Sequence, residues 1–187
     1  MSKINAICVY CGSSPGTEPA FVEAAHTFGK ILAENGVRLI YGGGSVGLMG
    51  ALAASALEHG GEVTGVIPEF LTKRERPRNL PQELVVTRDM HERKRIMFER
   101  ADAFVALPGG IGTLEELVEQ LTWIQLGRHK KPVLIANIQG YWGPLLALID
   151  HMHAVKFLPP GLRVDFLVTK RIDEILPMLR ETARKVA

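Results

Sequence analysis

The sequence of 187 residues is poor in several features that would assign it to a special class. It has two cysteines, 6% aromatic residues and a net charge of +2. No run approaches the roughly 18 apolar residues that a membrane-spanning helix needs, and the first five residues lack the apolar region of a signal peptide. The charge balance gives no general argument for binding to nucleic acid or to a membrane. We therefore expect a cytoplasmic protein with neither kind of partner.

The two cysteines form the pattern Cys8-Val-Tyr-Cys11, which nominally matches a redox C-x-x-C motif. Cys8 falls in a predicted strand, however, where residues three apart point to opposite faces. A reactive pair would favour a helix N-terminus, and a metal site would need a second pair of ligands that the sequence does not supply. His151 and His153 are only a pair, and they diverge on a helix. We predict free structural thiols, no metal and no cofactor.

Short apolar runs alternate with helical patterns along the chain. The predicted strands cover residues 4–10, 37–41, 62–67, 84–87, 102–107, 131–137 and 163–168. The predicted helices are one that Thr17 caps and Gly36 ends, one that follows residue 47 and ends at 59, and four near 90–100, 114–126, 144–155 and 172–184. Such alternation indicates βαβ units and a parallel sheet. The predicted fold class is α/β, with residues 1–187 forming a single doubly wound domain.

Three turns rich in glycine and small polar residues follow predicted strands. They are Gly12-Ser13-Ser14, residues 42–47 and residues 109–113. In doubly wound sheets, ligands bind beyond the carboxyl ends of the strands. We therefore predict that the three turns converge on one pocket, and Ser13 is a candidate contact.

The second of these turns, Gly42-x-Gly44-x-x-Gly47, matches a dinucleotide fingerprint between a strand and a helix. It follows the second strand rather than the first, and only Glu69, preceded by a proline, is available as the ribose-binding acid. A dinucleotide is therefore the weaker interpretation. Two glycine turns can instead hold one mononucleotide from two sides, with phosphate or ribose contacts from Gly43 and Gly44.

The turn Pro108-Gly-Gly-Ile-Gly-Thr-Leu-Glu-Glu116 joins the fifth strand to a helix. Glycines let a backbone approach a ligand closely, and the amides of a helix N-terminus attract anions. We interpret the turn as the holder of a phosphorylated sugar that presents Glu116 to the reacting carbon. Gly110, Gly112 and Thr113 would then contact phosphate and ribose. The alternative is structural, because Thr113-x-x-Glu116 also matches a capping box.

The stretch Met90-His-Glu-Arg-Lys94 opens a helix with three basic side chains, although cations near a helix N-terminus oppose its dipole. Such a mild violation of a local rule is expected at a functional site. The alternative is an amphipathic helix with Met90, Met97 and Phe98 in the core and Arg93 in a surface ion pair. The basic run at residues 73–78 is either a solvated loop or a flap that helps to hold a phosphate.

Together, the motifs at residues 42–50, 90–94 and 108–116 resemble those of the Lonely Guy family, whose members are cytokinin riboside 5′-monophosphate phosphoribohydrolases. The resemblance spans roughly residues 5–150. It implies a Rossmann-like fold, a homodimer, and metal-free hydrolysis with Arg93 and Glu116 as catalytic residues. The substrate contacts that it implies are Lys94, Gly110, Ile111, Gly112, Thr113, Leu114, Glu115 and Thr122. Plant members often have Tyr at the position of Ile111.

The function expected from these motifs is hydrolysis of the N-glycosidic bond of a nucleoside 5′-monophosphate, either AMP or an N6-modified AMP. Glu116 would stabilise the oxocarbenium-like transition state or activate water, and Arg93 would position it. The alternative is a nucleotide-binding sensor or carrier, which would not require both residues. A nicotinamide oxidoreductase is a third possibility. A pyridoxal enzyme is a weaker one, since Lys94 is the only lysine near a motif.

Overall fold

A parallel sheet forms the centre of the computed structural model, which describes residues 4–72, 82–158 and 165–186. Seven strands occur in these residues in the order β4-β3-β2-β1-β5-β6-β7, and all neighbouring pairs are parallel. The strands are β1 (Ala6–Tyr10), β2 (Arg38–Tyr41), β3 (Val63–Pro68), β4 (Glu83–Thr87), β5 (Ala103–Ala106), β6 (Val133–Ala136) and β7 (Leu167–Thr169). The predicted α/β class is confirmed, because short buried apolar runs are typical of strands covered on both faces.

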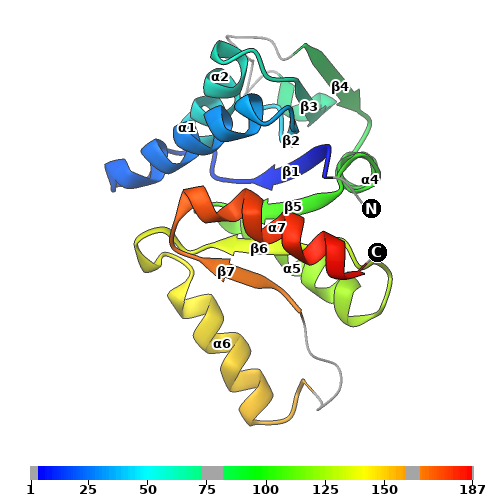
Figure 1. Cartoon of the computed structure of the whole chain (residues 1–187). Coiled ribbons are helices and arrows are strands. Elements are labelled where there is room, and N and C mark those ends of the chain that lie inside the picture. The colour runs from blue at the N-terminus through cyan, green and yellow to red at the C-terminus, as the bar shows by residue number, and fades with distance from the viewer. Residues whose placement is uncertain (1–3, 73–81, 159–164, 187) are drawn as a thin grey trace.

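Helices cover both faces of this sheet (Figure 1). They are α1 (Pro19–Glu34), α2 (Gly47–Glu58), α3 (Glu69–Thr72), α4 (Met90–Arg100), α5 (Ile111–Gln125), α6 (Gly143–Ala154) and α7 (Ile172–Val186), with a 3-10 turn η1 (Ile138–Gly140) before α6. Helices α1, α2 and α7 bury one apolar cluster against the sheet, and α4, α5 and α6 pack on a second cluster. The doubly wound arrangement is therefore confirmed. That residues 1–187 form one domain stays a prediction.

The strand order places a topological switch between β1 and β5. The chain leaves β1 toward β2, β3 and β4 on one side, and returns through α4 to β5 on the other. The connections after β1 and β5 therefore diverge to opposite faces, and they leave a crevice at the carboxyl ends of these two strands. This crevice is where the turns after Tyr10 and Ala106 begin.

Several predicted boundaries were wrong for identifiable reasons. Thr17 does not cap α1: the N-cap is Glu18, and Pro19, with its fixed φ, begins the helix without a side-chain bond. The helix expected from residue 114 begins at Ile111. Its true start was missed because Ile111 and Gly112 are exposed and the first turn lacks the apolar pattern that reveals a helix. A short helix, α3, follows β3 where the sequence pattern predicts none. Asp89 caps α4, since its Oδ1 accepts a hydrogen bond of 2.8 Å from the Glu92 amide.

Two of the predictions concern segments that the structure describes incompletely. The basic run at residues 73–78 lies outside the described residues, so neither interpretation of it is tested. The start of the last predicted strand, at residues 163 and 164, also lies outside them, and β7 covers only the end of that prediction.

Both cysteines are free and buried, as predicted. Cys8 belongs to the apolar cluster under α4 and α5, and Cys11 to the cluster under α1 and α2, so the two thiols do lie on opposite faces. Burial raises the pKa of each thiol, which removes the thiolate that redox chemistry needs. In the described part of the chain, no three His, Cys, Asp or Glu side chains are grouped to hold a metal ion.

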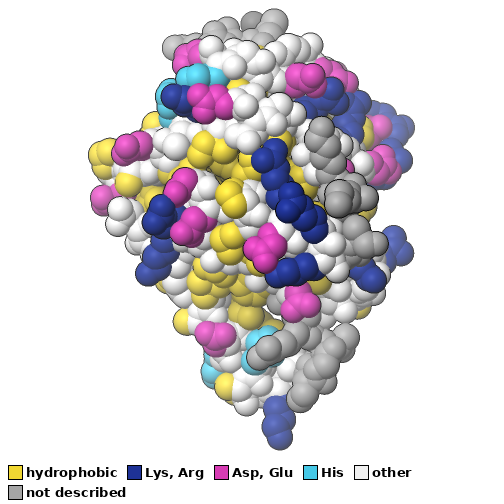
Figure 2. All heavy atoms as spheres, in the orientation of Figure 1, with side chains coloured by type: hydrophobic (Ala, Val, Ile, Leu, Met, Phe, Trp, Pro, Cys, Tyr) yellow, Lys and Arg dark blue, Asp and Glu magenta, His cyan; other side chains and the backbone are white. Residues whose placement is uncertain are grey.

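The surface agrees with the near-neutral charge. On the face drawn in Figure 2, lysine and arginine side chains lie among aspartates and glutamates. Within the described residues, none of the helices combines the length and apolar character that crossing a membrane requires. A cytoplasmic location stays a prediction from the sequence.

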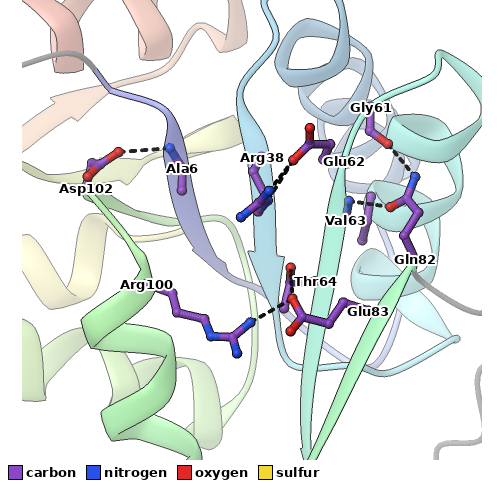
Figure 3. A network of polar contacts seen from close by, with 10 residues as sticks. All are labelled: Ala6, Arg38, Gly61, Glu62, Val63, Thr64, Gln82, Glu83, Arg100 and Asp102. Atoms are coloured by element: carbon purple, nitrogen blue, oxygen red, sulfur yellow. Dashed lines mark hydrogen bonds and ion pairs between the residues drawn. The ribbon is translucent and has the colours of Figure 1, made fainter.

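Polar side chains connect the strands at the amino end of the sheet (Figure 3). Arg38, at the start of β2, pairs with Glu62 next to β3. At the start of β4, Glu83 Oε2 accepts hydrogen bonds from Arg100 Nη1 at 2.7 Å and from Thr64 Oγ1 at 3.0 Å. These pairs fix neighbouring strands at the end opposite to the crevice.

Candidate active site

The three glycine-containing turns lie close together at the carboxyl end of the sheet, but only the turns after β1 and β5 line the pocket there; residues 42–47 are not part of its wall. The Gly12 amide donates a hydrogen bond of 3.0 Å to the Pro108 carbonyl, which joins the turns after β1 and β5. Gly47, at φ +61°, lies against the Ser13 backbone, where a Cβ atom on residue 47 would come within 2.4 Å of the carbonyl carbon. Only glycine fits at this contact, because a side chain would meet main-chain atoms that have no room to move.

A pocket of about 230 Å³ opens at this junction. Its lining residues are Gly12, Ser13, Ser14, Pro15, Gly16, Phe21, Leu48, Pro108, Gly109, Gly110 and Tyr141. Two of the predicted contacts, Ser13 and Gly110, are in this wall. The pocket therefore coincides with the crevice at the topological switch.

The two helix N-termini near the pocket differ in whether their amides are available. In α2, the Leu48 and Met49 amides donate to the Gly12 carbonyl, at 3.0 and 3.2 Å, so these donors are already used. Helix α5 has Gly110 as its N-cap and no side-chain cap. First-turn amides have no partner within their own helix, and the Cβ direction of Gly110 is open. An anion is therefore accommodated best at α5.

This difference weakens the expectation that Gly43 and Gly44 form a second phosphate-binding turn. Gly43, at φ +77°, lies against Ile67, and both glycines are buried. The turn after β2 has another role, which the sequence did not reveal. A Cβ atom on Gly42 would lie 2.4 Å from Arg93 Nη2, so the absence of a side chain there admits the guanidinium.

Arg93 is buried, and two hydrogen bonds hold its guanidinium. Its Nη1 donates to Glu116 Oε1 at 2.6 Å, and its Nε donates to the Val66 carbonyl at 3.0 Å. The side chain thus connects α4 to β3 and α5 below the pocket turns. The surface ion pair considered from the sequence is therefore excluded, since Arg93 and Glu116 expose only 8% and 7% of their surfaces.

Glu116 lies inside α5 and points to α4 rather than to the start of its own helix. Because the N-cap is Gly110, Thr113 and Glu116 are both helical residues and form no capping box. Burial raises the pKa of Glu116, and the Arg93 guanidinium offsets part of that rise. A buried carboxylate held by one fixed cation has the properties of a catalytic acid or base whose protonation is tuned by its surroundings.

The other predicted residues are spread along α5 and α4. Lys94 Nζ lies 2.6 Å from Glu115 Oε1 and 3.0 Å from Glu119 Oε1, so it connects the two helices. Glu119 was missed, although its i, i+4 spacing from Glu115 was a usable signal. Thr113 is buried beside Gly109, Leu114 is half-buried, and Ile111 and Gly112 are exposed. Thr122 is exposed, and its hydroxyl donates to the Val118 carbonyl of its own helix.

Comparison with known proteins identifies the family of this chain. A family model described as possible lysine decarboxylase matches residues 49–179. A cytokinin riboside 5′-monophosphate phosphoribohydrolase of Arabidopsis thaliana is 47% identical over 181 residues, which are 96% of this chain and 83% of the relative. One from Rhodococcoides fascians is 44% identical, over 94% of this chain and 89% of its own. The chain belongs to the Lonely Guy family of phosphoribohydrolases.

The Lonely Guy fold is shared with proteins of other names. The Moco carrier protein of Chlamydomonas reinhardtii superposes with a TM-score of 0.72 at 22% identity, over 98% of this chain and 99% of its own. A molybdenum cofactor binding protein from Rippkaea orientalis gives 0.70 at 21%, over 97% and 98%. Identity this low shows the common fold alone. The buried Arg93–Glu116 pair is therefore the better guide to chemistry in this chain.

Tyr141 is one of several residues lining the pocket of this Lonely Guy protein that were not predicted as contacts; Phe21 and Leu48 are others. Tyr141 reaches the pocket from the segment between β6 and α6, and its hydroxyl donates to the Gly109 carbonyl at 2.5 Å. Its position after the strand that adjoins β5 was a signal available in the sequence. The ring also makes an edge contact with Phe21, at 5.5 Å between centroids.

Proposed function

We propose that this protein hydrolyses the N-glycosidic bond of a nucleoside 5′-monophosphate to free base and ribose 5-phosphate. The substrate is AMP or an N6-modified AMP such as a cytokinin riboside monophosphate, the class named for its relatives. One observation carries the proposal for this chain: the helix whose N-terminus has no side-chain cap, α5, also supplies the glutamate of a buried arginine–glutamate pair. Binding an anion needs only the helix N-terminus, whereas cleaving a glycosidic bond uses the N-terminus and the arginine–glutamate pair.

The 5′-phosphate is proposed to bind at the start of α5, against the amides of Gly110, Ile111 and Gly112. Helix amides and dipole stabilise a negative charge there. Lys94, Thr113, Glu115 and Thr122 are proposed as further contacts with the nucleotide, as are Ser13, Gly43, Gly44 and Leu114. Phosphate bound at this place would hold the ribose over Glu116, so that binding energy remote from the reacting bond orients the sugar.

In the reaction, the bond between ribose C1′ and the base nitrogen breaks and a water oxygen adds to C1′. The bonding electron pair leaves with the base, which gains one proton, and the attacking water loses one. The transition state is positive at the sugar, so the Glu116 carboxylate stabilises it and orients the water. Arg93 holds this carboxylate in place, and its charge opposes the rise in the pKa of Glu116 that burial causes.

A homodimer belongs to this proposal. Helices α4 and α5 carry the site, and α5 and the residue that follows it expose apolar side chains, with 82% of Ile111 and 69% of Leu126 accessible. Two copies related by a two-fold axis would cover this surface over about 800 Å² per subunit. Light scattering at micromolar concentration is expected to give twice the mass of 20.5 kDa. A monomer with full activity would contradict the dimer.

Two other activities fit the geometry less well. A lysine decarboxylase of the pyridoxal type needs a lysine amine that is free to form a Schiff base. Lys94, the lysine nearest the site, has its amine between two carboxylates. A nucleotide carrier on the same fold would need the anion site, but it gives no reason to bury Arg93 with Glu116.

The deciding experiment incubates the protein with AMP, isopentenyladenosine monophosphate and adenosine, and measures free base by chromatography. We expect base release from one or both monophosphates and little from adenosine, with activity unchanged by EDTA. Equal cleavage of adenosine and AMP would mean that the phosphate site is wrong. Binding of AMP without base release would favour the carrier.

A further inference from the structure

The segment between β6 and α6 has an unusual backbone. Gln139 and Gly140 follow one another at φ 51° and φ 75°. A left-handed conformation is costly for a residue with a side chain, and such conformations persist where surrounding bonds enforce them. Here Asn137 supplies those bonds. Its side-chain Oδ1 accepts a hydrogen bond of 2.7 Å from the Trp142 backbone amide, and its own backbone amide donates one of 2.7 Å to the Thr169 carbonyl.

This constrained turn places Tyr141 at the pocket. Its ring makes edge contacts with Phe21 on α1 and with Trp142, at centroid distances of 5.5 and 5.0 Å. Its hydroxyl donates to the Gly109 carbonyl, 32 residues earlier in the chain. Tyr141 still exposes 39% of its surface and forms part of the pocket wall. The turn thus directs one aromatic side chain onto one carbonyl group.

The Gly109 carbonyl shares a peptide plane with the Gly110 amide. In a trans peptide, the C=O and the N–H that follows it point in opposite directions, so fixing the oxygen also fixes the direction of the hydrogen. The plane lies between two glycines, the residues that oppose its rotation least. Gly109 is closely approached by its neighbours, because a Cβ atom there would lie 2.2 Å from Thr113 Oγ1 and 2.8 Å from the Gly12 nitrogen. The Cβ direction of Gly110 is open, so the hydrogen bond from the tyrosine hydroxyl is a side-chain contact that orients the plane.

We propose that Tyr141 is a positioning residue for the substrate phosphate: by holding the Gly109 carbonyl, it directs the Gly110 amide into the anion site at the start of α5. This inference rests on the proposed function insofar as that function places the phosphate there. Tyr141 itself needs no contact with the reacting atoms. Its effect is on the affinity for phosphorylated ligands, and the affinity for adenine is independent of it.

The test compares wild type with Tyr141→Phe, which removes the hydroxyl and keeps the ring. A single hydrogen bond contributes modestly, so the KM for AMP and the Kd for ribose 5-phosphate should both rise about 3- to 10-fold. Turnover at saturating AMP should change less than twofold. The matched control is Thr72→Val, which removes a hydroxyl that also donates to a backbone carbonyl, that of Glu69 at 2.7 Å, away from the pocket. The control should leave both constants unchanged.

A second measurement distinguishes a change in the position of the Gly110 amide from a general loss of rigidity of the protein. In ¹⁵N-labelled wild type, ribose 5-phosphate should shift the Gly110 amide resonance, and in Tyr141→Phe that shift should become smaller while the resonances of α7 stay in place. If Tyr141→Phe binds ribose 5-phosphate as tightly as wild type, the inference is wrong even when AMP is cleaved. If wild type binds ribose 5-phosphate without cleaving AMP, the proposed function fails, and the comparison of Kd values still decides the role of Tyr141. If wild type cleaves AMP without measurable binding of ribose 5-phosphate, the KM for AMP in Tyr141→Phe decides the role of Tyr141. If wild type neither cleaves AMP nor binds ribose 5-phosphate, both are overturned.

Discussion

The two ends of the sheet use the same kind of ion pair for different purposes. At the amino end, Arg100 pairs with Glu83 at 2.7 Å, and both side chains are more than 40% exposed. At the carboxyl end, Arg93 pairs with Glu116 at 2.6 Å, and both are about 10% exposed. The arginine hydrogen bond lowers the pKa of Glu83, whereas burial raises the pKa of Glu116 despite its arginine. The surroundings, more than the pairing, decide what the carboxylate does.

The polar side chains at the amino end of the sheet thus connect its strands. In addition to the ion pairs, Asp102 Oδ2 accepts from the Asn5 and Ala6 amides at 2.8 and 3.0 Å, which ties β5 to the chain entering β1 (Figure 3). Exposed pairs contribute little stability each and can be lost one at a time. At the carboxyl end, a charge left without its partner would be buried, which is costly. Substitutions at the two ends should therefore have very different effects.

The largest contrast is expected in turnover. Glu116→Gln keeps the size of the side chain and removes its charge, so turnover of AMP should fall by on the order of 10² or more while the protein stays folded. Glu62→Gln, the same change at the amino end, should leave turnover unchanged. Steady-state rates with circular dichroism as a check of folding test both. Near-normal turnover in Glu116→Gln would make Glu116 a structural residue.

The next effect concerns pH. Arg93→Met removes the cation that lowers the pKa of Glu116, so this pKa should rise further and the acid limb of the kcat/KM profile should move to higher pH. A carboxyl whose pKa is raised on folding contributes stability below its unfolded pKa and loses it as pH rises through the folded pKa. The free energy of unfolding of Arg93→Met should therefore fall below that of wild type more at neutral than at acidic pH. The loss at pH 7 should be about 4 kcal/mol.

The double variant Arg93→Met with Glu116→Gln provides the control for this prediction. It contains no buried charge, so most of the stability lost at neutral pH should return. Urea unfolding at pH 5 and pH 7.5 measures the difference for each variant. If Arg93→Met has the same stability at both values, Glu116 does not titrate with a raised pKa.

A smaller effect separates close packing from backbone conformation. Gly47 and Gly36 have nearly equal φ values of +61° and +63°, but a Cβ atom meets the Ser13 backbone at residue 47 and nothing within 4 Å at residue 36. Gly36→Ala should cost about 1 kcal/mol for the left-handed conformation alone. Gly47→Ala should cost about 3 kcal/mol, because the turn at Ser13 must also shift. Equal costs for Gly36→Ala and Gly47→Ala would mean that the turn at Gly47 is not in close contact with the turn at Ser13.

The elements of the fold could be predicted from the sequence because their signals are local. Buried runs such as Ala103–Ala106 are apolar throughout, and Asp89 is followed by a recognisable helix. The start of α5 was missed since its first turn serves the pocket and carries no apolar pattern. The role of Gly42 was missed because its neighbour Arg93 is distant in the chain. Glu119 and Tyr141 were missed although spacing and position after a strand were available as signals. Motifs identify the atoms that could react, but they do not show what holds those atoms in place.

The smallest effect on stability is predicted at the amino end of the sheet. It sets the baseline against which the effects at the carboxyl end are compared. Arg38→Met removes one member of an ion pair in which the arginine is 51% and Glu62 is 67% exposed. Water can solvate the glutamate that remains, so the free energy of unfolding should fall by less than about 1 kcal/mol. The loss should also shrink in 1 M salt, where exposed charges are screened. Urea titrations of wild type and Arg38→Met at low and high salt give this difference directly, and turnover of AMP serves as the second readout. A loss of several kcal/mol, or any large loss of turnover, would mean that the amino end supports the site through the strands, and the two ends could no longer be treated as independent.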